Sequence, residues 1–141
     1  MDVRDIVQTE VVTVRIDDTL LTAAETLRDA GVGSAVVLDV DGAPCGIVTD
    51  RDLVVYGLDH VDALEHTVVD EVMSADLFTV AASAGVFDVV ERMREERVRR
   101  VPVVEGGDLV GIVTLDDLVV LLARELSGLA DVIEAEMPAR R

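Results

Sequence analysis

The stretch that decides the fold is GIVTDRDL, from Gly46 to Leu53, which recurs as GIVTLDDL from Gly111 to Leu118. Six of its eight residues are identical in the two copies, which lie 65 residues apart. In each copy a short apolar run typical of a strand ends at a threonine, and the polar residues that follow favour a helix start. The chain therefore contains one strand-to-helix junction twice.

The repetition extends outward from this junction over nearly the whole chain. Upstream of the hairpin turn the spacing is 66 residues, one more than downstream, because the second turn is shorter by one residue. Agreement at so many positions in one order indicates an internal duplication. The upstream matches pair residues 3–7 with 69–73, 13–14 with 79–80, and 37–38 with 103–104.

Each copy has the same predicted order of elements. A short strand near Thr13 or Thr79 opens the copy, and a helical apolar stripe follows, as at Leu20, Ala24 and Leu27, with Asp18 as the expected N-cap. A hairpin comes next, with turns at Asp41-Gly42 and Gly106-Gly107, because glycine tolerates positive φ. The second hairpin strand leads into the second helix at the junction. The expected unit is β-α-β-β-α, in an α+β fold.

The domain limits follow from this repeat. We predict a first repeat at residues 1–60, a linker at 61–68, a second repeat at 69–130 and a C-terminal tail at 131–141. His60 lies just before the linker and His66 lies in it, and we interpret both as exposed side chains rather than metal ligands. The single cysteine, Cys45, lies within a strand and is expected to act as a small apolar side chain.

The charge balance excludes several partners. The chain has 29 acidic residues against 12 basic ones, all of them arginine, and a net charge of −17. Such a surface repels nucleic acid and anionic lipid, and a phosphate-binding loop that depends on lysine is impossible. The acidity resembles that of proteins from salt-loving archaea, so we expect a halophilic protein whose self-repulsion is screened by concentrated salt.

The start of the chain is charged and lacks the apolar run of a secretion signal. The longest plain apolar run, residues 118–123, is too short to span a bilayer. We therefore expect a cytoplasmic protein that binds no membrane. That run and residues 53–56 are apolar around the whole helix, so they need a covering partner, and we predict a homodimer.

The repeated junction resembles the end of a CBS domain, and so does Arg99 to Val104 before the second hairpin. The resemblance covers residues 3–57 and 69–126. It implies two units related by a pseudo-twofold axis, each with a small sheet packed against two helices, and two clefts between them. It also implies a regulatory module that binds AMP, ADP, ATP, S-adenosylmethionine or a similar ligand, with no obligate cofactor and no enzymatic activity.

The resemblance also assigns roles to residues of the two clefts. It places Asp52 and Asp117 on a ribose, Thr49 and Thr114 beside phosphate, and Thr13 and Thr79 at the base. A Thr-x-x-Asp string at a helix start also forms a capping box without any ligand, and both roles remain open. The candidate ligand-binding residues are Thr13, Gly33, Ser34, Thr49, Asp50, Arg51, Asp52, Thr79, Arg99, Arg100, Thr114 and Asp117.

The arginines distinguish the two clefts in this prediction. Arg99 and Arg100 correspond to the neutral Gly33 and Ser34 of the first copy. We expect the two arginines to approach the cleft of Thr49 and Asp52 and, with Arg51, to bind a phosphorylated nucleoside there. The cleft of Thr114, Asp116 and Asp117 would then take a less anionic ligand or stay empty. The alternative is that the arginines pair with nearby acids on the surface.

Three functions remain at this point. The first is a nucleotide sensor that acts on an unknown effector protein through a change of shape. The second is a ligand-free scaffold or dimerisation module. The third is an unrecognised hydrolase, which is the weakest because no catalytic constellation is visible: Cys45 has no adjacent histidine, and paired acids are expected at this acidity.

Overall fold

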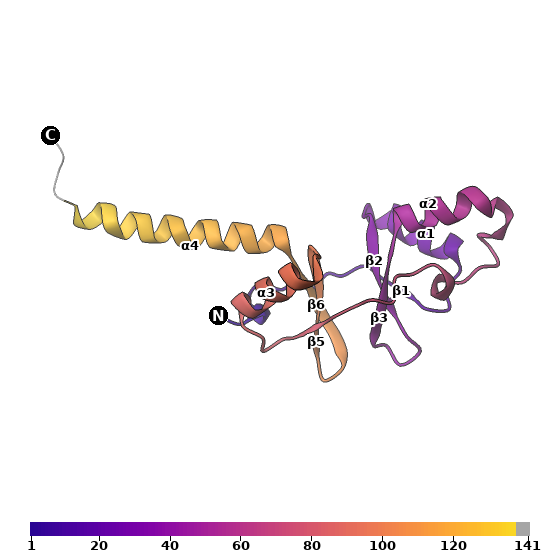
Figure 1. Ribbon diagram of the computed structural model, residues 1–141, viewed down its shortest axis with the longest axis horizontal. Coiled ribbons are helices and arrows are strands. Elements are labelled where there is room, and N and C mark those ends of the chain that lie inside the picture. The colour runs from indigo at the N-terminus through magenta and orange to yellow at the C-terminus, as the bar shows by residue number, and fades with distance from the viewer. Residues whose placement is uncertain (138–141) are drawn as a thin grey trace.

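Two three-stranded sheets, each carrying helices, make up the computed structural model, which describes residues 1–137 (Figure 1). This confirms the expected α+β class and the β-α-β-β-α order of each copy. The first copy comprises β1 (Thr13–Arg15), α1 (Leu20–Ala30), β2 (Ser34–Leu38), β3 (Pro44–Thr49) and α2 (Asp50–Asp59). The second comprises β4 (Val80–Ala81), α3 (Val86–Glu96), β5 (Arg100–Glu105), β6 (Asp108–Thr114) and α4 (Leu115–Glu136).

Both sheets have the same topology. The opening strand pairs in parallel with the next strand, which in turn forms an antiparallel hairpin with the third, giving the orders β1-β2-β3 and β4-β5-β6. The registers correspond as well, since Ser34 lies opposite Thr49 and Arg100 lies opposite Thr114. The first residue of each middle strand is therefore fixed beside the threonine of its own strand-to-helix junction.

Local signals account for most turns and caps. Gly42, Gly106 and Gly107 have φ values of +85°, +61° and +87°, as the hairpin turns require. One expected cap is wrong: α1 is capped by Thr19, whose hydroxyl accepts a hydrogen bond from the Thr22 amide, and not by Asp18. The Asp18 carboxylate instead accepts from the amide of Arg15, which closes the turn before the helix.

The opening segment of each sequence copy packs on the other copy. The 3-10 helix Val3–Asp5 donates from the Val3 amide to the Ala84 carbonyl at 2.8 Å, and Val3 is fully buried in the core of the second copy. The matching 3-10 helix Val69–Glu71 places Val69 in the core of the first copy. A further 3-10 helix, Val61–Ala63, lies in the segment that leads to it. The packed units are thus not the two halves of the sequence.

This exchange explains the glycine that opens the repeated string. The segment after each 3-10 helix forms a two-residue bridge with the outer strand, Gln8 with Ile112 and Ser74 with Ile47. A Cβ atom on Gly111 would lie 2.5 Å from the Gln8 carbonyl oxygen, and one on Gly46 would lie 2.8 Å from that of Ser74. Only glycine lets the two backbones approach so closely.

Each copy has its own hydrophobic core between its sheet and helices. The cores consist of Val, Leu, Ala and Met side chains, with Leu20 and Leu118 among the largest that are fully buried. The junction helices are anchored in these cores by Leu53 and Leu118. Their N-termini are thereby held against the sheet edge where the candidate residues lie.

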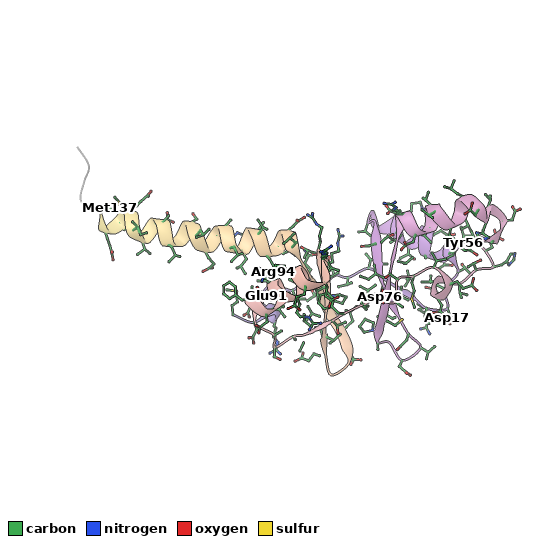
Figure 2. All side chains as sticks on the ribbon, in the orientation of Figure 1. Asp17, Tyr56, Asp76, Glu91, Arg94 and Met137 are labelled. Atoms are coloured by element: carbon green, nitrogen blue, oxygen red, sulfur yellow. The ribbon has the colours of Figure 1, made fainter. Side chains whose placement is uncertain are left out.

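Helix α4 extends far beyond its own core. Figure 1 shows it projecting away from both sheets, and Figure 2 shows the side chains of its far part standing clear of other elements as far as Met137. The tail expected from residue 131 starts inside this helix, and its residues 138–141 lie outside the described part. The predicted domain limits therefore stay predictions. No helix within residues 1–137 combines the length and the apolarity needed to cross a membrane.

Candidate functional site

The candidate site is a cavity of about 470 Å³ lined by residues of both copies. Its volume falls within the range of small-molecule sites, roughly 300–1,000 Å³. Six of the predicted residues line it: Gly33, Ser34, Arg99, Arg100, Thr114 and Asp117. They come from the starts of β2 and β5, the end of β6 and the first turn of α4.

Hairpin register brings these residues to one edge. The Leu115 amide donates to the Arg99 carbonyl at 2.8 Å, and the Asp50 amide donates to the Gly33 carbonyl at 2.9 Å. Each bond ties the residue before a middle strand to the first turn of a junction helix. The cavity is therefore built by the same local geometry in both copies, but its charged groups come mainly from the second.

The two junction aspartates are held differently. In the first copy Asp52 forms a full capping box: its Oδ2 accepts from the Thr49 amide at 2.9 Å, and its own amide donates to Thr49 Oγ1 at 3.1 Å. In the second copy the Asp117 amide donates to Thr114 Oγ1 at 3.2 Å. The Asp117 carboxylate, however, accepts from Gln8 Nε2 at 2.6 Å and lines the cavity. The capping role therefore accounts for Asp52, whereas Asp117 faces the cavity.

The arginines lie in a different place from the one expected. Arg99 and Arg100 line the cavity with Thr114, Asp116 and Asp117, not with Thr49 and Asp52. The cause is the hairpin register, which sets Arg100 opposite Thr114 of its own copy. The prediction that Arg99 and Arg100 approach the cleft of Thr49 and Asp52, and not that of Asp116 and Asp117, is therefore wrong.

The surface-pairing alternative holds for one of these two arginines. Arg99 Nη2 contacts Asp116 Oδ1 at 3.2 Å, with both side chains mostly exposed. Arg100 makes no ion pair with any residue between 1 and 137. Its guanidinium is the cation that the described cavity offers to an anionic ligand.

The other predicted residues are not gathered in this cavity. Thr13 lies in a shallow depression beside Gly111, and Thr79 lines another beside Asp88. Arg51 and Asp52 border a depression that contains Tyr56 and His60. Asp50 borders an apolar groove between α1 and α2. Thr49 lines none of these hollows and serves as the α2 cap.

Four lining residues that precede β1 are absent from the predicted site residues: Gln8, Glu10, Val11 and Val12. Gln8 bridges the outer strand of the second copy, so its place depends on the exchanged segment. The close approach at Gly111 is the signal that could have located it, because a glycine in a strand often marks a neighbouring backbone.

The lining can make three kinds of contact. Val12, Val36 and Ile47 are among the apolar side chains that could contact a planar ring. Asp117 can accept hydrogen bonds from hydroxyl groups, and Arg100 can bind an anionic group. Three carboxylates, those of Glu10, Asp116 and Asp117, face two guanidinium groups, so the cavity is not strongly cationic.

The remaining candidate groups are placed away from this cavity. The His60 ring stacks on Tyr56 with centroids 4.2 Å apart. Residues 1–137 contain no group of three His, Cys, Asp or Glu side chains that could hold a metal ion. Cys45 is half-buried against the first core, and burial, with the carboxylates of Asp39 and Asp70, raises the pKa of its thiol.

Comparison with protein families gives one match over most of the chain. The model of the CBS domain matches residues 3–59 and again residues 69–124. Among curated proteins, the CBS domain-containing protein YhcV of Bacillus subtilis is 34% identical, over 91% of this chain and 91% of that protein. Two uncharacterised relatives, from Methanopyrus kandleri and Methanocaldococcus jannaschii, are longer, and the match spans 61% and 43% of them.

Two solved structures are informative about ligands. The crystal structure of Hypoxic Response Protein I with two coordinated zinc ions has a TM-score of 0.73 at 33% identity and covers 84% of this chain and 97% of that one. The CBS domain pair of protein MJ0100, in complex with 5′-methylthioadenosine and S-adenosyl-L-methionine, has a TM-score of 0.72 at 25% identity, covering 89% and 98%. The matches come from bacteria and archaea of varied kinds.

Proposed function

The chain belongs to the CBS domain family as a tandem pair, a regulatory module rather than a catalytic one, and from this premise we propose that its cavity senses an adenosine-containing ligand. The observation that carries the proposal is the Asp117 carboxylate, which lines a cavity of about 470 Å³ together with Arg100, a residue without an ion pair in the described part of the chain. A carboxylate can accept hydrogen bonds from both hydroxyls of a ribose diol, and a guanidinium can bind a phosphate or carboxylate group. The complex of MJ0100 with adenosyl ligands supports this chemistry.

Charge favours a ligand with one anionic group. Arg100 supplies the one lining guanidinium that has no ion pair among residues 1–137, whereas three carboxylates line the same cavity. Each further phosphate of ADP or ATP would add negative charge beside these acids, which costs about 1 kcal/mol per pair at 4 Å even in water. We therefore propose that AMP or S-adenosylmethionine binds more tightly than ATP.

The test is calorimetric titration of the whole chain with AMP, ATP and S-adenosylmethionine in concentrated potassium chloride. Asp117→Asn is expected to weaken AMP binding roughly tenfold or more, because it removes an ionised acceptor. The matched variant Asp52→Asn alters the capping box outside the cavity and is expected to leave the affinity for AMP unchanged. A wild-type chain that binds none of the three ligands would contradict the sensor proposal. The ligand-free scaffold would then be the remaining function.

A second proposal concerns assembly, for which exposed apolar side chains on α4 are the specific observation. Leu126, Leu129 and Ile133 are 67%, 63% and 60% exposed. Together with Val119 and Leu122 they recur at alternating intervals of three and four residues, the spacing of a helix-pairing seam. Few charges flank this stripe, so the chain's acidity opposes pairing little there. We propose a homodimer in which α4 packs on the partner's α4.

A further inference from the structure

We propose that Gln8 is a positioning residue that turns the Asp117 carboxylate toward the cavity and so makes this junction, not the one at Asp52, the ribose-binding one. The inference rests on the proposed function of the cavity. It concerns a residue outside the repeated junction, brought there by the exchanged N-terminal segment.

The backbone of Gln8 is held in place on both sides. Its amide donates to the Ile112 carbonyl at 2.9 Å, and its carbonyl accepts from the Ile112 amide at 2.9 Å. Gly111 lets this segment approach the strand closely. Upstream, Val3 is buried in the core of the second copy. Gln8 therefore presents its side chain from a fixed point, and its side-chain nitrogen Nε2 donates to Asp117 Oδ2 at 2.6 Å.

The first copy provides an internal comparison. Ser74 makes the same pair of backbone bonds with Ile47, at 3.0 and 2.9 Å. Its side chain is shorter than that of glutamine and makes no hydrogen bond to Asp52 within residues 1–137. Asp52 then turns back on its own helix and accepts from the Thr49 amide. The two junctions share their backbone geometry and differ in whether a long amide side chain reaches the aspartate.

The difference decides which aspartate is available to a ligand. A carboxylate has about four lone-pair positions, and the Gln8 amide uses one of those on Oδ2. The others remain free on the cavity side, where a diol can donate to them. In the capping box of Asp52 the carboxylate serves the end of the helix instead.

The first test compares AMP with 2′-deoxy-AMP in titrations of the wild type, Gln8→Ala and the matched control Ser74→Ala. The wild type is expected to prefer AMP by roughly tenfold, the effect of a hydrogen bond to a charged group. Gln8→Ala should reduce that preference severalfold, because AMP loses the bonds of two hydroxyls to Asp117 whereas 2′-deoxy-AMP loses only that of its 3′-hydroxyl, and Ser74→Ala should keep it. If Gln8 had a merely structural role, Gln8→Ala would weaken the binding of AMP and of 2′-deoxy-AMP equally. An unchanged preference in Gln8→Ala would overturn the inference.

The second test needs no ligand. In a crystal structure of Gln8→Ala, the Asp117 carboxylate is expected to accept from the Thr114 amide, as Asp52 accepts from Thr49. A carboxylate that stays in the cavity would overturn the positioning role. If the wild type binds neither nucleotide, the proposed function fails, and this structure still decides whether Gln8 orients Asp117.

Discussion

At the scale of single residues, the same Thr-x-x-Asp string produces two different hydrogen-bond arrangements. Asp52 closes a capping box with Thr49, whereas Asp117 leaves its cap half-formed and binds Gln8. The same pair of junction residues, threonine and aspartate, thus serves helix stability in one copy and, in our proposal, recognition in the other. The distinction lies in a neighbouring side chain, which is far away in the sequence.

The close approach at Gly111 gives a prediction about stability. Gly111→Ala places a Cβ against Val7 and the Gln8 carbonyl, so one backbone must move. We expect a loss of about 1–3 kcal/mol in the free energy of unfolding, measured by denaturant titration. Gly128 of α4 has nothing within 4 Å of an added Cβ, so Gly128→Ala should gain up to about 1 kcal/mol. Equal effects of the two variants would contradict this account.

Cys45 gives a prediction about reactivity. Burial first, and then the carboxylates of Asp39 and Asp70, raise the pKa of its thiol. Because the thiolate is the nucleophile, its alkylation by iodoacetamide should be slower than that of a free thiol at pH 8. The rate should rise through a higher pH range than for the free thiol. The unfolded chain in denaturant serves as the control and should recover the ordinary rate; a native chain that reacts as fast would contradict the shift.

At the scale of elements, the exchanged 3-10 helices and α4 matter most. The 3-10 helix at Val3–Asp5 belongs to the first copy in sequence and to the second copy in packing. It ties the two copies together and carries Gln8 to the cavity. Helix α4 begins as the anchor of Asp117 and ends as an exposed projecting helix with an apolar stripe (Figure 2).

The exposed face of α4 predicts how the chain assembles. Light scattering in concentrated potassium chloride should give twice the 15.1 kDa mass of one chain. Leu126→Glu combined with Ile133→Glu places charges on the seam and should produce monomers, because an apolar seam loses stability when it must bury a charge. Ser127→Glu adds one such charge beside the seam and should remain dimeric. A monomeric wild type would contradict pairing through α4.

At the scale of the whole molecule, the net charge of −17 dominates the long-range energetics. The five ion pairs found within residues 1–137 are all exposed and contribute little, about 0–1 kcal/mol each. Most of the acidic side chains therefore repel one another in dilute buffer. The relatives from varied bacteria and archaea do not address salt preference, and the halophilic character stays a prediction.

That repulsion predicts a dependence of stability on salt. Raising potassium chloride from 0.1 to 1 M shortens the screening length from about 10 Å to about 3 Å. The thermal midpoint of unfolding should therefore rise, and most of the gain should come at the low end of the range. A neutral solute at matched osmolality should produce a smaller rise. A midpoint that stays flat or falls with potassium chloride would contradict a halophilic protein.

The sequence by itself determined the duplication, the order of elements, the hairpin turns and the two strand-to-helix junctions, because apolar periodicity, glycine and capping residues act over a few neighbours. It also indicated the family through the repeated GIVT string. The tertiary structure alone decided that the opening segments exchange, that Arg99 and Arg100 lie beside Asp117, and that Gln8 reaches it. These facts depend on hairpin register and on packing between segments over 100 residues apart, as from Gln8 to Asp117, which no local pattern encodes.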